Sequence, residues 1–155
     1  MCGIVGYVGP QQALDVVIEG LRRLEYRGYD SAGVAIVANG EIESRKKSGK
    51  LANLEADISA SPLQKSSTGI GHTRWATHGA PSDVNAHPHL SEDGSIAIIH
   101  NGIIENFAVL RDKLIAEGVK LRSQTDSEVV AHLLAKQIKT TPDLGDALRE
   151  VCQSL

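Results

Sequence analysis

The sequence is poor in aromatic residues and has no strong excess of charge. Its 155 residues include one Phe, one Trp and three Tyr, which are too few to line a surface on which nucleic-acid bases stack. The formal net charge is -3, without a basic or acidic block, so the chain has no marked electrostatic attraction to nucleic acid or to anionic lipid. We therefore expect neither a nucleic acid nor a membrane as a partner.

Cysteine and long apolar runs are scarce as well. The two cysteines, Cys2 and Cys152, lie at opposite ends of the chain, and no apolar run is long enough to span a bilayer or to serve in a secretory leader. We expect a reducing, cytoplasmic compartment in which both cysteines stay unpaired, with Cys152 in the core. Hydrophobic residues make up 41% of the sequence, which is ordinary for a globular protein, and the length of 155 residues suits one domain that encloses a genuine core.

The first half of the chain carries both strand and helix signals. Apolar residues recur at helical spacing after a short β-rich run near the amino terminus. The dipeptide Asn39-Gly40 is a favoured hairpin turn between two strand-like segments. The predicted elements are strands at 4–8, 32–38, 41–47 and 69–72, and helices at 13–26 and 51–58.

The second half is mainly helical. One apolar strand is predicted at 96–99, followed by a helix at 107–118 that closes at a glycine. Thr125 and Glu128 have the spacing of a capping box at the start of a helix that runs to about residue 139. In that arrangement the hydroxyl and the carboxylate cover free backbone donors of the first turn.

A last helix is predicted from Pro142 onward. The order of strand, helix, strands and then helices, without an internal repeat, argues for one layered α+β domain. The apolar pattern continues to the last residue, so we expect the domain to be truncated at this end. The apolar face of the last helix is formed by Leu144, Leu148, Val151 and Leu155.

The amino terminus holds the first candidate for catalysis. Cys2 is followed by Gly3, and removal of Met1 beside such small residues would make Cys2 the first residue. Its α-amine, partly unprotonated at neutral pH, could then take the proton of its own thiol and generate a nucleophile. A cysteine in second place is weak evidence by itself, because a nucleophile needs partners elsewhere in the chain.

A polar loop of unusual composition follows the predicted strand at 69–72. Surface loops without a role tend to consist of Ser, Gly, Lys and Glu, whereas this one contains Arg74, Trp75 and several histidines. Arg74 could form a bidentate fork with a carboxylate ligand, or it could form a buried structural pair with Trp75. No metal is expected, because zinc-site spacing is absent from the histidines in and near this loop, which are His78, His87, His89 and His100.

A second group of candidates follows the strand at 96–99. The amide of Asn101 and the backbone N–H of Gly102 could converge on a developing oxyanion, although an Asn-Gly pair is also common in plain turns. Asp126, near the start of a predicted helix, could complement the helix dipole or receive a substrate ammonium. The residues alone leave both alternatives open.

Taken together, the motifs resemble the amino-terminal glutamine amidotransferase domain of the glucosamine-6-phosphate synthases, a family of class II (N-terminal nucleophile) amidotransferases. The resemblance covers the whole chain. The motifs at 72–79 and 85–89 distinguish it from other class II families. The motifs are CGIVG at 2–6, LEYRGYDSAG at 24–33, HTRWATHG at 72–79, NAHPH at 85–89 and HNGIIEN at 100–106.

The resemblance implies an α+β fold, a four-layer αββα sandwich of the N-terminal nucleophile hydrolase type, incomplete at its carboxyl end. Residues 1–155 would then be a C-terminally truncated glutaminase domain that hydrolyses L-glutamine to glutamate and ammonia without a cofactor. Family members continue into sugar-isomerase domains, absent here, that bind fructose 6-phosphate and receive the ammonia, and the full-length protein is expected to be a homo-oligomer. The alternatives are an amidotransferase of the amidophosphoribosyltransferase type and a non-catalytic glutamine-binding domain.

The resemblance also implies a role for individual residues. Cys2 would attack the glutamine side-chain amide and form a thioester, and Asn101 and Gly102 would build the oxyanion hole. Arg74 would bind the α-carboxylate of glutamine and Asp126 its α-ammonium. The remaining implied positions are Trp75, Thr77 and His78 in the loop that closes over glutamine, Arg27 near the nucleophile, and His87 beside the pocket wall.

Overall fold

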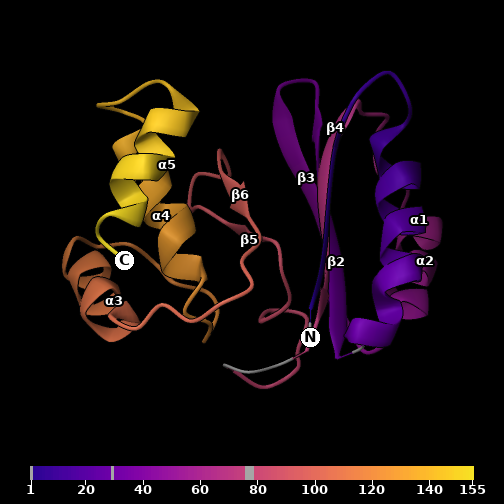
Figure 1. The fold of residues 1–155 in the computed structure, drawn as a ribbon, viewed down its shortest axis with the longest axis horizontal. Helices are drawn as coiled ribbons and strands as arrows, with labels where there is room; N and C mark the ends of the chain where they lie inside the picture. The colour runs from indigo at the N-terminus through magenta and orange to yellow at the C-terminus, as the bar shows by residue number, and fades with distance from the viewer. Residues whose placement is uncertain (1, 29, 76–78) are drawn as a thin grey trace. The chain divides into compact units, whose positions relative to one another are not determined.

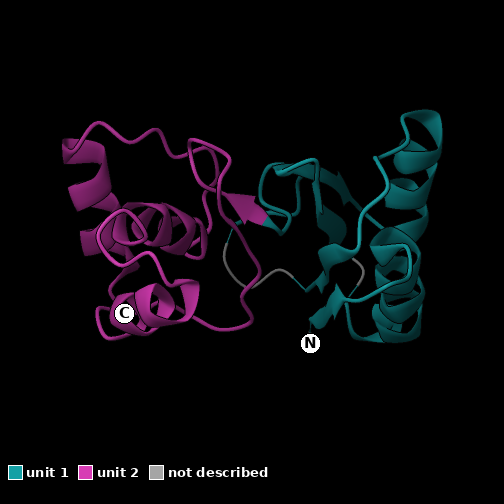
Figure 2. Cartoon of the chain, turned by 90° about the horizontal axis from the view of Figure 1, so that it is seen from above, with its two compact units in different colours: residues 1–88 teal, residues 89–155 magenta. Residues whose placement is uncertain are grey.

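The computed structural model describes residues 2–28, 30–75 and 79–155. The chain divides into two compact units, residues 1–88 and 89–155 (Figure 2), and each has a hydrophobic core of its own. That both belong to one glutaminase domain remains a prediction. Within the described ranges, no helix combines the length and the apolar character needed to cross a bilayer.

A four-stranded antiparallel sheet forms the centre of the first unit. Two helices lie against one face of this sheet, as Figure 1 shows, and the core of the unit fills the layer between them. The strands follow the order β1 (Gly3–Val8), β4 (Thr68–Arg74), β2 (Ser31–Ala38) and β3 (Glu41–Ser48), and the helices are α1 (Ala13–Leu24) and α2 (Leu51–Ala60).

The helix α1 forms because its apolar residues recur on one face. These side chains are buried against the sheet, while arginines and acidic residues occupy the opposite face. The helix ends at Leu24, earlier than the predicted end at 26, and a short 3-10 turn, η1 (Glu25–Arg27), follows it. The buried apolar residues of α1 are Leu14, Val17, Ile18 and Leu21.

The predicted hairpin between β2 and β3 is confirmed. Asn39 and Gly40 have φ angles of 53° and 83°, the left-handed conformation that a two-residue turn between twisted strands requires. The pairing then runs from Ala38 with Glu41 to Ser31 with Ser48. This turn therefore sets the register of the two strands.

The second unit is mostly helical. The helices share one apolar core, against which Ile98 of a two-stranded ribbon packs. The strand at 96–99 is confirmed in shortened form as β6, whereas its partner β5 was not predicted. The elements are β5 (His89–Leu90), β6 (Ala97–Ile98), α3 (Phe107–Ala116), α4 (Glu128–Gln137) and α5 (Leu144–Cys152).

The predicted capping box is wrong. The N-cap of α4 is Ser127, and no side chain caps this end. The Glu128 carboxylate instead accepts hydrogen bonds from backbone N–H groups of Arg122 and Ser123, which precede the helix. The Thr125 hydroxyl contacts His89 rather than the first turn. Both polar groups thus organise the chain before the helix.

The prediction for α5 was correct in type and wrong in orientation. Ala147 and Val151 are its buried residues, whereas Leu144 is 53% and Leu148 is 42% exposed. Cys152, expected in the core, is exposed as well. Helical periodicity locates the stripe of apolar residues, but which part of that stripe is buried depends on how the helix packs on α4.

Candidate functional site

In the first unit, the thiol of Cys2 lies at the head of β1, beside the end of β4. The backbone N–H of Trp75 donates a hydrogen bond to Cys2 Sγ over 3.2 Å, and Sγ lies 3.5 Å from the Trp75 carbonyl oxygen. The β1–β4 ladder pairs Gly3 with Thr73, so the register brings the residues next to this pair together. Cys2 is partly exposed and is not in a disulfide. The thiol is therefore oriented by backbone groups and remains accessible.

Arg74, the last residue of β4, is only 4% exposed. Its Nη2 donates to the carbonyl oxygen of Gly79 over 3.1 Å, and its own carbonyl oxygen accepts the N–H of Asp30 over 3.0 Å. Gly28 lies so close that a Cβ there would be 2.9 Å from the Arg74 carbonyl carbon. These contacts fix both the backbone and the guanidinium of Arg74.

Trp75 follows Arg74 directly, and the η1 turn that ends at Arg27 contacts β4. Trp75 is 45% exposed. This exposure differs from what a buried structural pair with Arg74, the alternative to carboxylate binding, would require. Arg27 ends the η1 turn, and its guanidinium carbon lies 5.9 Å from the centre of the Tyr26 ring. The predicted loop residues Thr77 and His78 lie outside the described residues.

His87 lies inside the first unit, against the sheet. It is 5% exposed, and its ring centre lies 4.5 Å from that of His72 in β4. A Cβ at Gly33 of β2 would be 2.1 Å from the His87 carbonyl oxygen, so glycine is what allows the two backbones to approach this closely. The role of His87 beside a glutamine pocket stays a prediction.

The second unit brings Asp126 together with the segment that carries Asn101 and Gly102. The backbone N–H of Ile104 donates to Asp126 Oδ2 over 2.8 Å, and Asp126 is 4% exposed. Asn101 and Gly102 are exposed. A backbone donor next to an accessible amide can serve an oxyanion. The buried Asp126 carboxylate also lies 3.3 Å, at Oδ1, from the hydroxyl of Ser127.

The residues on either side of Asp126 in the chain, Ser123, Thr125 and Glu128, belong to a buried polar network that the sequence did not predict. The Glu128 carboxylate accepts from the Ser123 N–H over 2.6 Å and from the Ser123 hydroxyl over 2.7 Å. Burial would raise the pKa of Glu128, but hydrogen bonds from His132, Arg122 and Ser123 outweigh it and lower this pKa to about 2. The segment before α4 is thereby tied down by an ionised carboxylate.

The network continues through Thr125 to the ribbon. The Thr125 hydroxyl lies 2.9 Å from both Ser123 Oγ and His89 Nε2. The run of hydroxyl and acidic residues from 123 to 128 was the available signal, but such runs are usually solvent-exposed. Among the residues that the structure describes, no group of three His, Cys, Asp or Glu side chains is arranged to bind a metal.

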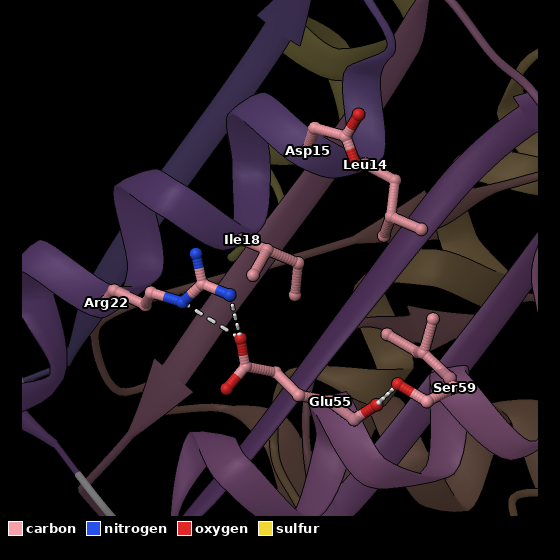
Figure 3. Close-up of a pocket in the computed structure, with 7 residues that line it drawn as sticks. Leu14, Asp15, Ile18, Arg22, Glu55 and Ser59 are labelled. Carbon is pink, nitrogen blue, oxygen red and sulfur yellow. Dashed lines mark hydrogen bonds and ion pairs between the residues drawn. The ribbon is translucent and has the colours of Figure 1, made fainter.

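The first unit also has a surface hollow of about 390 Å³ between α1 and α2. Figure 3 shows Arg22 reaching across it to Glu55, with a hydrogen bond of 2.9 Å from Arg22 Nε to Glu55 Oε1. The predicted site residues do not line it, so it is separate from the surroundings of Cys2. Its lining consists of Leu14, Asp15, Ile18, Arg22, Glu55, Ile58 and Ser59.

Several curated proteins similar to this chain carry the same name. The glutamine--fructose-6-phosphate aminotransferase (isomerizing) of Streptomyces coelicolor is 62% identical over 155 residues, which are 100% of this chain and 25% of that protein. The enzyme of the same name from Thermus thermophilus is 56% identical, again over 100% of this chain and 25% of its own length. The chain thus spans about a quarter of the length of these relatives.

Two solved structures resemble the whole chain. Glutamine phosphoribosylpyrophosphate amidotransferase from B. subtilis, complexed with ADP and GMP, has a TM-score of 0.81 at 26% identity. A structure described as the allosteric regulatory enzyme of purine biosynthesis has a TM-score of 0.84 at 27% identity. This chain covers 33% of each. The likeness confirms the predicted α+β class and the N-terminal nucleophile type of fold.

The family itself is shown by a match to the sequence model of the glutamine amidotransferase domain. That match extends over residues 43–141, which is more than half of the chain. It includes Arg74, Asn101, Gly102 and Asp126, and the curated relatives extend the similarity to Cys2. The chain therefore belongs to the glutamine amidotransferase domain family, as its motifs predicted.

Proposed function

We propose that the protein is the glutaminase part of a glutamine–fructose-6-phosphate aminotransferase. In this role it hydrolyses L-glutamine to glutamate and ammonia, and the ammonia is passed to fructose 6-phosphate by sugar-isomerase domains of the longer protein. The observation that carries the proposal is the thiol of Cys2, bonded to the Trp75 backbone just beyond β4, the strand whose last residue is Arg74. The 62% identity to an enzyme of that name supports the choice of reaction.

The proposed reaction begins with removal of Met1. The freed amine of Cys2 takes the thiol proton, and the sulfur attacks the side-chain carbonyl carbon of glutamine. The carbon–nitrogen bond then breaks, the nitrogen leaves as ammonia with the transferred proton, and a thioester remains. Water, activated by the same amine, adds to the thioester, and glutamate leaves as the thiol is restored.

Binding and charge stabilisation are assigned to the other candidates. Arg74 is proposed to bind the α-carboxylate and Asp126 the α-ammonium, each through a charge-assisted hydrogen bond. Asn101 and Gly102 are proposed to stabilise the oxyanion, a contribution of roughly 3 kcal/mol per donor in other hydrolases. Trp75, Thr77 and His78 are proposed to cover the substrate, with Arg27 near the sulfur and His87 behind the pocket wall.

The proposal extends to location and assembly. We place the protein in the cytoplasm, which is supported by two cysteines that are not joined in a disulfide, and we expect the longer protein to be a homo-oligomer. An amidophosphoribosyltransferase role is less favoured, because the solved enzymes of that kind are only 26% to 27% identical. It would be recognised by transfer of ammonia to a phosphoribosyl substrate instead of fructose 6-phosphate.

The decisive experiment measures glutamate release from L-glutamine, with the intact mass of the same sample recorded. Turnover by Met-free protein, abolished in Cys2→Ala, would support the proposal. A diazoketone analogue of glutamine should alkylate the Cys2 sulfur with release of N2, and the added mass, that of the analogue less N2, should appear on no other residue. Glutamine binding that survives in Cys2→Ala, with no turnover and no labelling of the wild-type protein, would instead identify a non-catalytic binding domain.

A further inference from the structure

The segment from His100 to Ile104 is attached to the start of α4 at both of its ends. At one end, the Ile104 N–H donates to Asp126 Oδ2 over 2.8 Å. At the other end, His100 Nδ1 lies 3.1 Å from the hydroxyl of Ser127, which in turn lies 3.3 Å from Asp126 Oδ1. Both attachments therefore lead to the two oxygens of a single carboxylate.

The middle of this segment is exposed to solvent. Asn101 and Gly102 are exposed, and Ile103 is 71% exposed. Ser127 and Ile104, in contrast, are 2% and 5% exposed. The Ile104 attachment is therefore shielded from water, and the attachment of the half-buried His100 ring is shielded on its Ser127 side. Hydrogen bonds shielded in this way resist competition from solvent. The two anchored ends therefore restrain the backbone that carries Asn101 and Gly102 between them.

The direction of the hydrogen bonds at His100 follows from proton counting. An ionised carboxylate only accepts, so the single hydroxyl proton of Ser127 is donated to Asp126. The Ser127 oxygen must then accept from His100, which requires the tautomer with its proton on Nδ1. The His100 ring is thereby oriented against Gly102, where an added Cβ would lie 2.6 Å from Nε2.

We propose that His100 and Ser127 are positioning residues. They orient the oxyanion donors Asn101 and Gly102 because their hydrogen bonds link the segment that carries these donors to the Asp126 carboxylate. This inference rests on the proposed function, because it assigns to Asp126 a second role besides binding the α-ammonium. The Asp126 carboxylate would thus determine both where the α-ammonium of glutamine is bound and where negative charge on the amide oxygen is stabilised.

The kinetic consequence is a loss in the chemical step. In Ser127→Ala the Ile104 N–H still bonds to Asp126, so the carboxylate proposed to bind the α-ammonium stays in place. The KM for glutamine should therefore change less than threefold, whereas kcat should fall. Removal of an oxyanion donor lowers kcat by roughly 10²–10³-fold, and a donor that is only misaligned should lower it by about tenfold or more. His100→Ala should show the same pattern.

Conservative and matched variants separate positioning from general loss of structure. Ser127→Thr keeps the hydroxyl and His100→Asn places an amide N–H near the position of Nδ1, so both should regain most of kcat. Ser91→Ala removes another buried hydroxyl of the second unit, one that accepts the N–H of Ile96 over 3.0 Å. It should lower the thermal midpoint without altering kcat.

The test measures kcat, KM and thermal midpoint for wild type and these variants, together with amide hydrogen exchange of the peptide spanning 99–106. A selective fall in kcat, rescue by the conservative variants and faster exchange of that peptide would support the inference. If the wild type turns over glutamine and kcat is unchanged in Ser127→Ala, the inference is overturned while the proposed function stands. The same holds if kcat falls in Ser127→Thr and in Ser91→Ala as much as it does in Ser127→Ala. Absence of turnover in the wild type would overturn the proposed function, and this inference with it.

Discussion

The backbone of Trp75 holds the thiol of Cys2, with its N–H donating to Sγ over 3.2 Å. Cys2→Ser keeps a group that can accept this hydrogen bond but replaces the thiol with a much poorer nucleophile. We expect glutamate release to fall by several orders of magnitude, while the free energy of unfolding changes by less than about 1 kcal/mol. Denaturant unfolding and a glutaminase assay check both parts. Retained turnover would remove Cys2 from the role of nucleophile.

Arg74→Lys should weaken glutamine binding. Lysine keeps the positive charge but cannot form the planar, two-pronged contact with a carboxylate. We expect KM to rise by roughly 10- to 100-fold with a smaller effect on kcat. The control is a glutamine analogue without the α-carboxylate, for which wild type and variant should have similar kcat/KM values. A variant equally impaired toward that analogue would argue for a structural role, consistent with the buried contact to Gly79.

Gly33→Ala tests the close approach of two backbones in the first unit. The new Cβ would lie 2.1 Å from the carbonyl oxygen of His87, and a backbone atom cannot move aside as a side chain does. We expect a loss of about 3 kcal/mol or more in the free energy of unfolding. Gly6→Ala in β1 is the matched control, because no atom lies within 4 Å of its added Cβ. A similar loss in both variants would contradict the steric explanation.

Glu128 should make stability depend on pH in the acid range. Its pKa is lowered from 4.5 to about 2 in the folded chain, so the ionised form favours folding. This contribution, of the order of 3 kcal/mol, is present above pH 4.5 and is lost as the pH falls toward 2. Urea unfolding between pH 6 and 3 should show a decline that is weaker in Glu128→Gln. Equal slopes in the two proteins would rule out Glu128 as the source.

The sequence was informative where local pattern decides the structure. The spacing of Leu14, Val17 and Leu21 predicted α1, and Asn39-Gly40 predicted the hairpin, because helical periodicity and left-handed turn residues act over a few neighbours. The family, too, followed from short motifs whose order is readable along the chain. These features need no knowledge of distant contacts.

The remaining features depend on contacts between distant segments. The Glu128 carboxylate can be buried because the backbone N–H of Arg122, on the preceding segment, donates to it. The hydrogen bond between Thr125 and His89 joins residues far apart in the chain. The exposure of Leu144 follows from how α5 packs and not from its periodicity. For the candidate site, the residues themselves named Cys2 and Asp126 as candidates, and the family resemblance chose between their possible roles. The Trp75 and Ile104 backbone groups that orient them cannot be found from sequence motifs.

The ladder between β1 and β4 also limits how this chain can vary in length. Cys2 and Arg74 are neighbours only because Gly3 pairs with Thr73. One extra residue within either strand would displace the thiol by roughly 3.3 Å along the sheet and turn the side chains beyond it to the opposite face. Insertions at the exposed Asn39-Gly40 turn would leave this pairing intact. Length variation among functional homologues should therefore collect at such turns and avoid both strands.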